Sequence, residues 1–256
     1  PLYSSAASDV YKRQVLLSSA GLVLIVFGML QSKTWGWVVP LYTPEIAGVP
    51  IAPLGVSLTT WCIALGAALI ALFISWQRRL IRDGRSPLMQ PDLFSITTLR
   101  SGLSVLGAQY AVTAGLFFMV PVYLQMTLGY DALETGLKIF PLSVSLILFS
   151  IVGTALSRRW SPRRIVKVGQ STLVLSAVLL LGAVTEDLRG VLFAAGMFLA
   201  GSALGLLASQ LGNVNMSSVG EKDTSEVGGL QGVFQNLGSS LAVSYTHLTL
   251  PTNREV

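Results

Sequence analysis

Six stretches of this sequence are apolar enough and long enough to cross a lipid bilayer. They are residues 15–31, 55–76, 101–126, 135–156, 166–184 and 190–212, and a seventh begins at Val227 and is cut off at Ala242. A spanning helix needs about 20 mostly apolar residues. Because lipid offers backbone polar groups no partners, such stretches must be helical. The sequence predicts an all-α polytopic membrane protein with about six complete transmembrane helices and a truncated seventh.

Charged residues make up only 11% of the chain, against about 25% in soluble domains. They fall in the connections or near the ends of the stretches, and no Asp, Glu, Arg or Lys lies near the middle of a stretch. No pattern resembles a nucleophile with its base, a metal cluster or a phosphate-binding loop. We therefore expect neither an enzyme nor a bound cofactor. The basic residues are typical of membrane-protein loops, so they do not indicate a nucleic-acid partner.

The two ends of the chain mirror each other at the level of DNA. Codons that encode Ser4–Gln14 have a reverse complement that translates to Val243–Thr252. The string resembles the transposase adapter used in shotgun sequencing libraries. We therefore expect residues 1–14 and 243–256 to be non-native tails around an internal fragment. His247, the only histidine, then has no functional role, and the single Cys62 allows no disulfide within the chain.

Arginines are concentrated in two of the connections. Residues 77–100 and 157–165 contain Arg78, Arg79, Arg82, Arg85, Arg100, Arg158, Arg159, Arg163 and Arg164. Short loops rich in Lys and Arg face the cytoplasm, so both loops are placed there, in a multi-pass protein of the inner (plasma) membrane. The mixed apolar and polar stretch 87–94 is expected to lie along the membrane surface.

Uncharged polar residues inside the stretches are the candidates for a substrate path. They are Gln109, Tyr110, Gln210, Asn213, Gln235 and Asn236. Two interpretations remain open for them. They could form hydrogen bonds between helices, worth roughly 0.6 to 2 kcal/mol each, or line a polar path for a substrate.

Small residues recur every four positions in the sixth stretch and nearly so in the seventh. One stripe is Gly201, Gly205, Ser209 and Asn213, and the other is Gly228, Gly232, Asn236 and Ser239. Such stripes let helix backbones approach closely. We expect tight helix contacts along both.

The connection at residues 153–164 carries the most specific pattern, Gly153-Thr-Ala-Leu-Ser-Arg-Arg-Trp-Ser-Pro-Arg-Arg164. By physical reasoning alone it is a tight cytoplasmic turn whose arginines set the topology and meet anionic lipid. It resembles the Gly-x-Leu-Ala-Asp-Arg-x-Gly-x-Arg-Arg loop motif of the major facilitator superfamily. Ser157 stands where that motif has Asp and Ser161 where it has Gly. Gly153, Arg158, Arg159, Arg163 and Arg164 are the motif residues that we carry over.

Further segments are similar to the fourteen-span drug:proton antiporter branch of that superfamily (EmrB/QacA-like). They are residues 115–125, 129–136, 225–232 and 235–238. The resemblance implies that 15–76 forms two central linker transmembrane helices and that 77–100 is a cytoplasmic loop with an interfacial segment. Residues 101–242 would be the first five helices of the C-terminal bundle, the last one truncated.

The resemblance also implies a function. It is secondary active transport, in which the proton gradient is the energy source and small hydrophobic or cationic compounds are exported. The expected partners are the small-molecule substrate, protons and the lipid bilayer, and the protein is expected to be a monomer. The proton-binding carboxylates would lie in the absent N-terminal bundle. The alternatives are an importer or uniporter of another small solute, or a membrane protein without transport activity.

Overall fold

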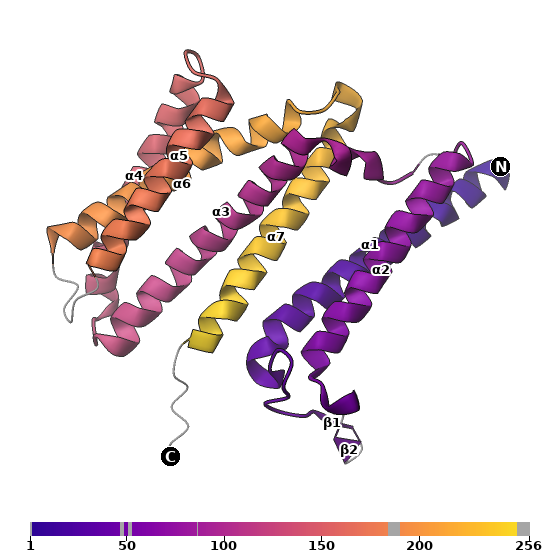
Figure 1. The fold of residues 1–256 in the computed structure, drawn as a ribbon, viewed down its shortest axis with the longest axis horizontal. Helices are drawn as coiled ribbons and strands as arrows, with labels where there is room; N and C mark the ends of the chain where they lie inside the picture. The colour runs from indigo at the N-terminus through magenta and orange to yellow at the C-terminus, as the bar shows by residue number, and fades with distance from the viewer. Residues whose placement is uncertain (1, 47–48, 51–52, 86, 184–189, 250–256) are drawn as a thin grey trace. The chain divides into compact units, whose positions relative to one another are not determined.

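A computed structural model describes residues 2–46, 49–50, 53–85, 87–183 and 190–249 (Figure 1). The α-helices are α1 (Leu2–Trp35), α2 (Leu58–Arg82), α3 (Thr97–Val122), α4 (Ala132–Leu156), α5 (Pro162–Gly182), α6 (Val191–Met216) and α7 (Thr224–Thr249). Short helical turns are η1 (Pro53–Gly55), η2 (Pro91–Ser95), η3 (Tyr123–Thr127) and η4 (Glu221–Asp223). The strands β1 (Glu45–Ile46) and β2 (Val49–Pro50) form one short antiparallel pair.

Six of the described helices are long and apolar enough to cross a membrane. They cover Tyr11–Trp35, Leu58–Arg82, Thr97–Thr127, Ala132–Leu156, Pro162–Gly182 and Val191–Met216. The all-α fold class with six complete spans is therefore confirmed. α7 contains the predicted seventh stretch and is helical, although it does not belong to these six. α1 and α7 also extend into the expected tails, while residues 1 and 250–256 lie outside the described residues. A helical backbone does not test whether those tails are native.

The chain divides into two compact units, and the first comprises Pro1–Ser95 with Ser240–Val256. In it, α1 and α2 lie side by side as a hairpin (Figure 1). A Cβ added to Gly66 would lie 2.6 Å from the Gly21 carbonyl oxygen, so the two backbones touch at these glycines. Ser57 joins the helices at one end, because its hydroxyl donates to the Gly36 carbonyl at 2.7 Å and accepts from the Thr59 N–H. The predicted linker pair is thus a closely packed hairpin.

The connection after α2 folds back onto that helix. The buried Gln77 amide oxygen accepts a hydrogen bond of 2.9 Å from the Leu88 N–H. Pro91 and Leu93 of η2 are buried as well. The segment 87–94 therefore packs partly on protein, and its expected position along the membrane surface stays a prediction.

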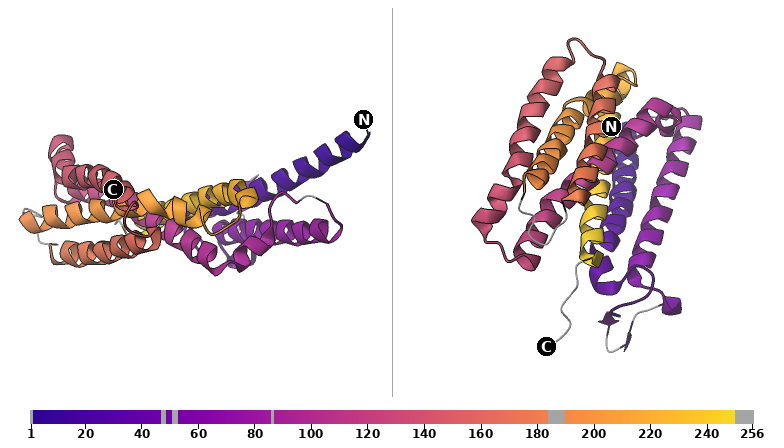
Figure 2. Two further views of the ribbon diagram at one scale, coloured as in Figure 1. Left: turned by 90° about the horizontal axis from the view of Figure 1, so that it is seen from above. Right: turned by 60° about the vertical axis from the view of Figure 1, so that its left-hand side comes forward.

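The second unit, Ile96–Ser239, is organised around α6. In the most apolar 18-residue window of α6, 61% of the residues are buried, against 17% to 22% in the corresponding windows of the other five spans. α3, α4 and α5 all pack on α6 (Figure 2). A helix surrounded on most sides by other helices is the expected centre of a bundle.

The stripe of small residues on α6 explains its closest contact, which is with α4. A Cβ on Gly201 would lie 2.1 Å from the Leu142 carbonyl oxygen, and one on Gly205 would lie 2.4 Å from the Leu146 carbonyl oxygen. The predicted tight contact is confirmed at these positions. The stripe ends at Asn213, which is exposed.

The corresponding prediction for α7 is wrong. A Cβ on Gly228 would make only an ordinary contact of 3.7 Å with the end of the Met216 side chain, one on Gly232 would meet no described residue within 4 Å, and Asn236 is exposed. The close approach is made instead by Gly238, whose added Cβ would lie 2.1 Å from the Gly107 carbonyl oxygen of α3. A four-residue spacing shows that a stripe exists, but not that this face of the helix meets a partner.

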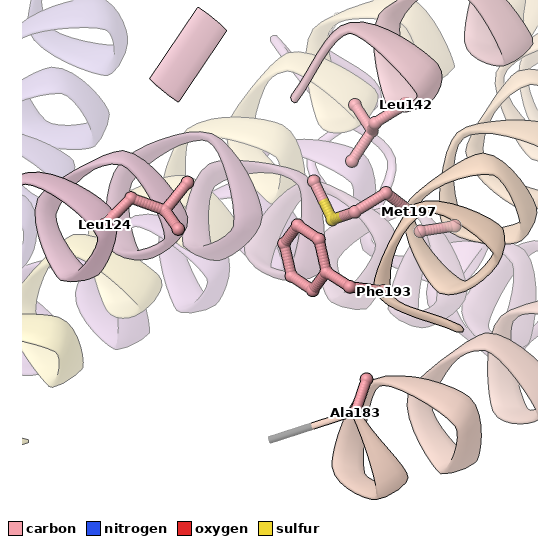
Figure 3. Packing of buried hydrophobic residues seen from close by; sticks show 6 residues of the cluster. Leu124, Leu142, Ala183, Phe193 and Met197 are labelled. Carbon is pink, nitrogen blue, oxygen red and sulfur yellow. The ribbon is translucent and has the colours of Figure 1, made fainter. Parts of the chain in front are cut away.

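An apolar cluster packs the end of the bundle farthest from the Arg-rich loop. It comprises Leu124, Leu142, Ala183, Phe193, Met197 and Ala200, most of which Figure 3 labels. Leu124 reaches this cluster from η3, a π-helical turn that starts two residues after Pro121. Such turns form where proline disturbs the helical hydrogen-bond ladder. Pro121 is thus followed by a local widening of the third span.

Candidate functional site

Two of the predicted path residues are buried amides that connect helices. The Gln109 side-chain nitrogen donates to the Leu204 carbonyl at 3.4 Å, from α3 to α6. The Gln210 side-chain nitrogen donates to the Gly153 carbonyl at 3.0 Å, from α6 to α4. Hydrogen bonding between helices therefore accounts for both donors. The amide oxygens of the same two residues are buried without a hydrogen-bond partner in the described part of the chain.

The other four predicted path residues differ in their surroundings. Tyr110 is half-buried against the cluster that contains Leu106, Leu207 and Leu211. Asn213 and Asn236 are exposed, and Asn236 donates to the Gly232 carbonyl of its own helix at 2.8 Å. Gln235 is half-buried. None of the six lines either of the two hollows described below. Their role in a substrate path stays a prediction.

The loop-motif glycine and a path residue meet in the structure. Gly153 is the residue of α4 whose carbonyl accepts from Gln210. An added Cβ at Gly153 would lie 2.2 Å from the Ser209 hydroxyl oxygen and 3.1 Å from the Ser209 Cβ, so α4 and α6 are in close contact at this point. The pattern identified from the loop and the pattern identified from buried amides thus belong to one contact. A larger residue at position 153 would have to displace the Ser209 hydroxyl.

The four motif arginines are exposed at the end of the same unit. The Arg163 guanidinium donates to the Thr98 hydroxyl at 3.3 Å, and the Arg164 guanidinium lies 4.8 Å from the centre of the Trp160 ring. The bond from Arg163 to Thr98 joins the start of α5 to the start of α3. The ends of the loops 77–100 and 157–165 therefore lie on one side of the unit, in agreement with their predicted placement in one compartment.

Two hollows accompany these arginines. The smaller, of about 370 Å³, lies along α4 and is lined by Ser150, Ile151, Thr154, Ala155 and Arg158. The larger, of about 440 Å³, lies between α3, α5 and α6 and is lined by Thr97, Thr98, Ser101, Gly102, Val105, Arg163, Val166, Lys167, Gln170, Leu211 and Val214. We call the larger one the α3–α5–α6 cavity.

Sequence reasoning missed most of this cavity. Lys167 and Gln170 follow Arg163 by four and seven residues, a spacing that places all three on one helix face and could have revealed them. Nothing in the sequence pairs that face with Thr98. Asn215 was also missed. It is fully buried against Gly102, and neither its amide oxygen nor its amide nitrogen has a hydrogen-bond partner among the described residues.

Residues 45–243, well over half of the chain, match the family described as Major Facilitator Superfamily. The chain belongs to the major facilitator superfamily. The family resemblance of the sequence is thereby confirmed at this level, and six membrane-length helices make the chain a multi-pass membrane protein with a partial form of the superfamily fold.

Two curated proteins illustrate the range of similarity within the superfamily. The chain is 22% identical over 234 residues to a "Probable actinorhodin transporter" of Streptomyces coelicolor, covering 89% of this chain and 37% of that protein. It is 24% identical over 159 residues to the "Uncharacterized MFS-type transporter YhcA" of Bacillus subtilis, covering 60% of this chain and 25% of that protein. The chain thus spans well under half the length of these relatives. No solved structure gives a significant match.

Proposed function

We propose that this chain is part of a secondary active transporter that exports small hydrophobic or cationic compounds in exchange for protons. The observation that carries the proposal is the superfamily match over residues 45–243, which coincides with helices of membrane-spanning length. Both relatives named above are described as transporters. In this proposal the protein lies in the inner membrane as a monomer, and the proton gradient supplies the energy.

The finer assignment is to the fourteen-span antiporter branch. It rests on the sequence similarity of residues 115–125, 129–136, 225–232 and 235–238 to that branch. The full-length transporter would then contain the present chain as an internal part, in which α1 and α2 are the central pair. The chain's coverage of 37% of the actinorhodin relative is compatible with that arrangement.

The buried amides supply chemistry that suits such substrates. The side-chain oxygens of Gln109 and Gln210 are acceptors without a partner, held in an apolar bundle. An acceptor of this kind favours a ligand that carries an N–H group or a positive charge. Both acceptors lie between helices of one unit, so rocking of two helix bundles would make them available to a ligand only together with a shift of α6 against α3 and α4. Tyr110, Asn213, Gln235 and Asn236 would extend the same polar surface.

Proton binding is assigned to the part of the transporter outside this chain. The described spans carry a single carboxylate, that of Glu134, in the first turn of α4. It takes part in a capping box, in which the Glu134 N–H donates to the Asp131 carboxylate at 2.7 Å. A carboxylate that caps a helix end at the membrane boundary is poorly placed for a relay through the bilayer.

The test uses the full-length gene in everted membrane vesicles. A cationic dye should be taken into energised vesicles, and a protonophore that collapses the proton gradient should stop this uptake. Dye movement that continues unchanged after the gradient collapses would contradict proton coupling. A Gln109→Leu variant should weaken dye transport more than a Thr113→Val variant, whose hydroxyl bonds only within α3.

A further inference from the structure

The α3–α5–α6 cavity combines two positive charges with an apolar floor. Arg163 and Lys167 lie one turn apart on α5, at the edge of the cavity. From α3, hydroxyl groups are contributed by Thr97, Thr98 and Ser101. Its deeper wall is formed by Val105, Val166, Leu211 and Val214. The volume of about 440 Å³ lies within the range of roughly 300–1,000 Å³ found for ligand pockets.

The two positive charges have no anionic partner among the residues that the structure describes. Among the residues that the structure describes, neither Arg163 nor Lys167 forms an ion pair, and the only hydrogen bond of the Arg163 guanidinium there goes to the neutral Thr98 hydroxyl. Like charges four residues apart on a helix repel each other. An anion bound between these two exposed side chains would relieve their mutual repulsion.

The backbone adds to the positive potential of this cavity. Thr97 and Thr98 are the first residues of α3, and Arg163 belongs to the first turn of α5. The N-terminal end of a helix carries a partial positive charge. At α3 the N-cap residue is Ile96, whose side chain offers no acceptor to the free N–H groups. The side chains and the backbone of this cavity thus both favour an anionic ligand.

We propose that the α3–α5–α6 cavity binds the phosphate group of an anionic membrane lipid from the cytoplasmic leaflet. The phosphate would lie between Arg163, whose planar guanidinium matches phosphate oxygens, and Lys167. The glycerol and first acyl carbons would follow Val105, Leu211 and Val214. Basic pockets between helices on the cytoplasmic side suit such head groups. A fully hydrophilic phosphate ester would leave the apolar wall uncovered, which is why the lipid is the favoured source.

The neighbouring hollow along α4 does not share these properties. It is lined by one helix only and contains one positive charge, Arg158. Arg158 and Arg159 therefore provide a matched control, because they belong to the same loop but lie outside the cavity. The inference does not depend on the proposed transport activity, since lipid binding can be measured without a substrate.

The test measures lipid retention by native mass spectrometry of the full-length transporter. The purified protein is titrated with phosphatidylglycerol, and three variants are compared with the parent: R163Q/K167Q, the control R158Q/R159Q, and S101F, which fills the cavity and keeps its charges. R163Q/K167Q should weaken phosphatidylglycerol binding about thirtyfold, from about 1 kcal/mol for each basic residue. S101F should weaken it as well, while the control should stay within about twofold of the parent, a change well below 1 kcal/mol.

Two outcomes would overturn the proposal. Equal losses in R163Q/K167Q and in the control would mean that the loop attracts lipid by its overall charge and not at a cavity. Unchanged phosphatidylglycerol binding in S101F would also show that the lipid does not bind in the cavity. Ser101 is exposed, so its replacement leaves the bundle core intact. Glycerol 3-phosphate is the competitor that separates the two phosphate sources. The lipid assignment requires that it fail to displace phosphatidylglycerol at equal concentration, and full displacement would refute that assignment.

Discussion

Replacing Gly201 with alanine should force α4 and α6 apart. An added Cβ would lie 2.1 Å from both the Leu142 carbonyl oxygen and the Ser145 hydroxyl oxygen, whereas ordinary contacts begin at 3.4 Å. The Leu142 carbonyl belongs to the backbone of α4, so it cannot rotate away. The two helices must therefore separate by about 1.3 Å, the shortfall between those two distances.

The expected loss of stability follows from three contributions. Overpacking of a tight contact costs about 1–3 kcal/mol, and a clash with fixed backbone belongs near the upper limit. Separation would also stretch the hydrogen bond of 3.0 Å from Gln210 to Gly153, worth about 0.6 kcal/mol between membrane helices. Alanine gains about 1 kcal/mol over glycine in helix propensity. Together these give a net loss of about 2 kcal/mol.

The measurement is the free energy of unfolding of the full-length protein in bicelles, obtained by steric trapping. G115A is the matched control, since Gly115 lies within α3 and an added Cβ there meets nothing within 4 Å. The control should be as stable as the parent or slightly more so. If G201A unfolds with the same free energy as G115A, the close approach of α4 to α6 is not what stabilises this bundle.

Three further substitutions test separate contacts. G102A should destabilise the bundle by about 1–3 kcal/mol, because its Cβ would lie 2.0 Å from the Asn215 amide oxygen; adding N215A should restore most of the loss, and no rescue would contradict this contact. S57A should lower the thermal stability of the α1–α2 hairpin by about 1 kcal/mol through its lost N-cap, as followed by circular dichroism. Q210L should cost about 0.6 kcal/mol by removing the side-chain donor to the Gly153 carbonyl, which keeps its bond from the Ser157 N–H, and an unchanged unfolding free energy would show that the bond from Gln210 contributes little.

The sequence determined the spans well, because the cost of exposing backbone polar groups to lipid leaves a long apolar stretch only one structure. The stripe on α6 was also predictable, and it led correctly to the contact at Gly201 and Gly205. The position of α6 at the centre of its unit was not, since all six spans have similar hydropathy. Lipid and protein are nearly equally apolar neighbours, so composition alone does not distinguish a helix facing one from a helix facing the other.

The candidate site was less accessible to sequence reasoning for a related reason. Gln109 and Gln210 were identifiable as unusual amides inside apolar stretches. Their acceptors are the backbone carbonyls of Leu204 and Gly153, and the side chains of those two residues do not indicate such a hydrogen bond. The cavity beside Arg163 depends on how α3 and α5 lean on α6, which no local pattern encodes. Hydrogen bonds to backbone carbonyls and cavities between helices can be identified only once the positions of the helices are known.

The central position of α6 has a consequence for how the membrane protein is assembled. α3, α4 and α5 precede α6 in the chain, so they enter the bilayer before the helix on which all three pack. Until then the face of α4 around Ser145 and Gly153 must remain open to lipid or to the insertion machinery. Folding of this unit is therefore a late event that waits for α6, and a ribosome that stalls before residue 191 would leave α3, α4 and α5 without the helix on which all three pack.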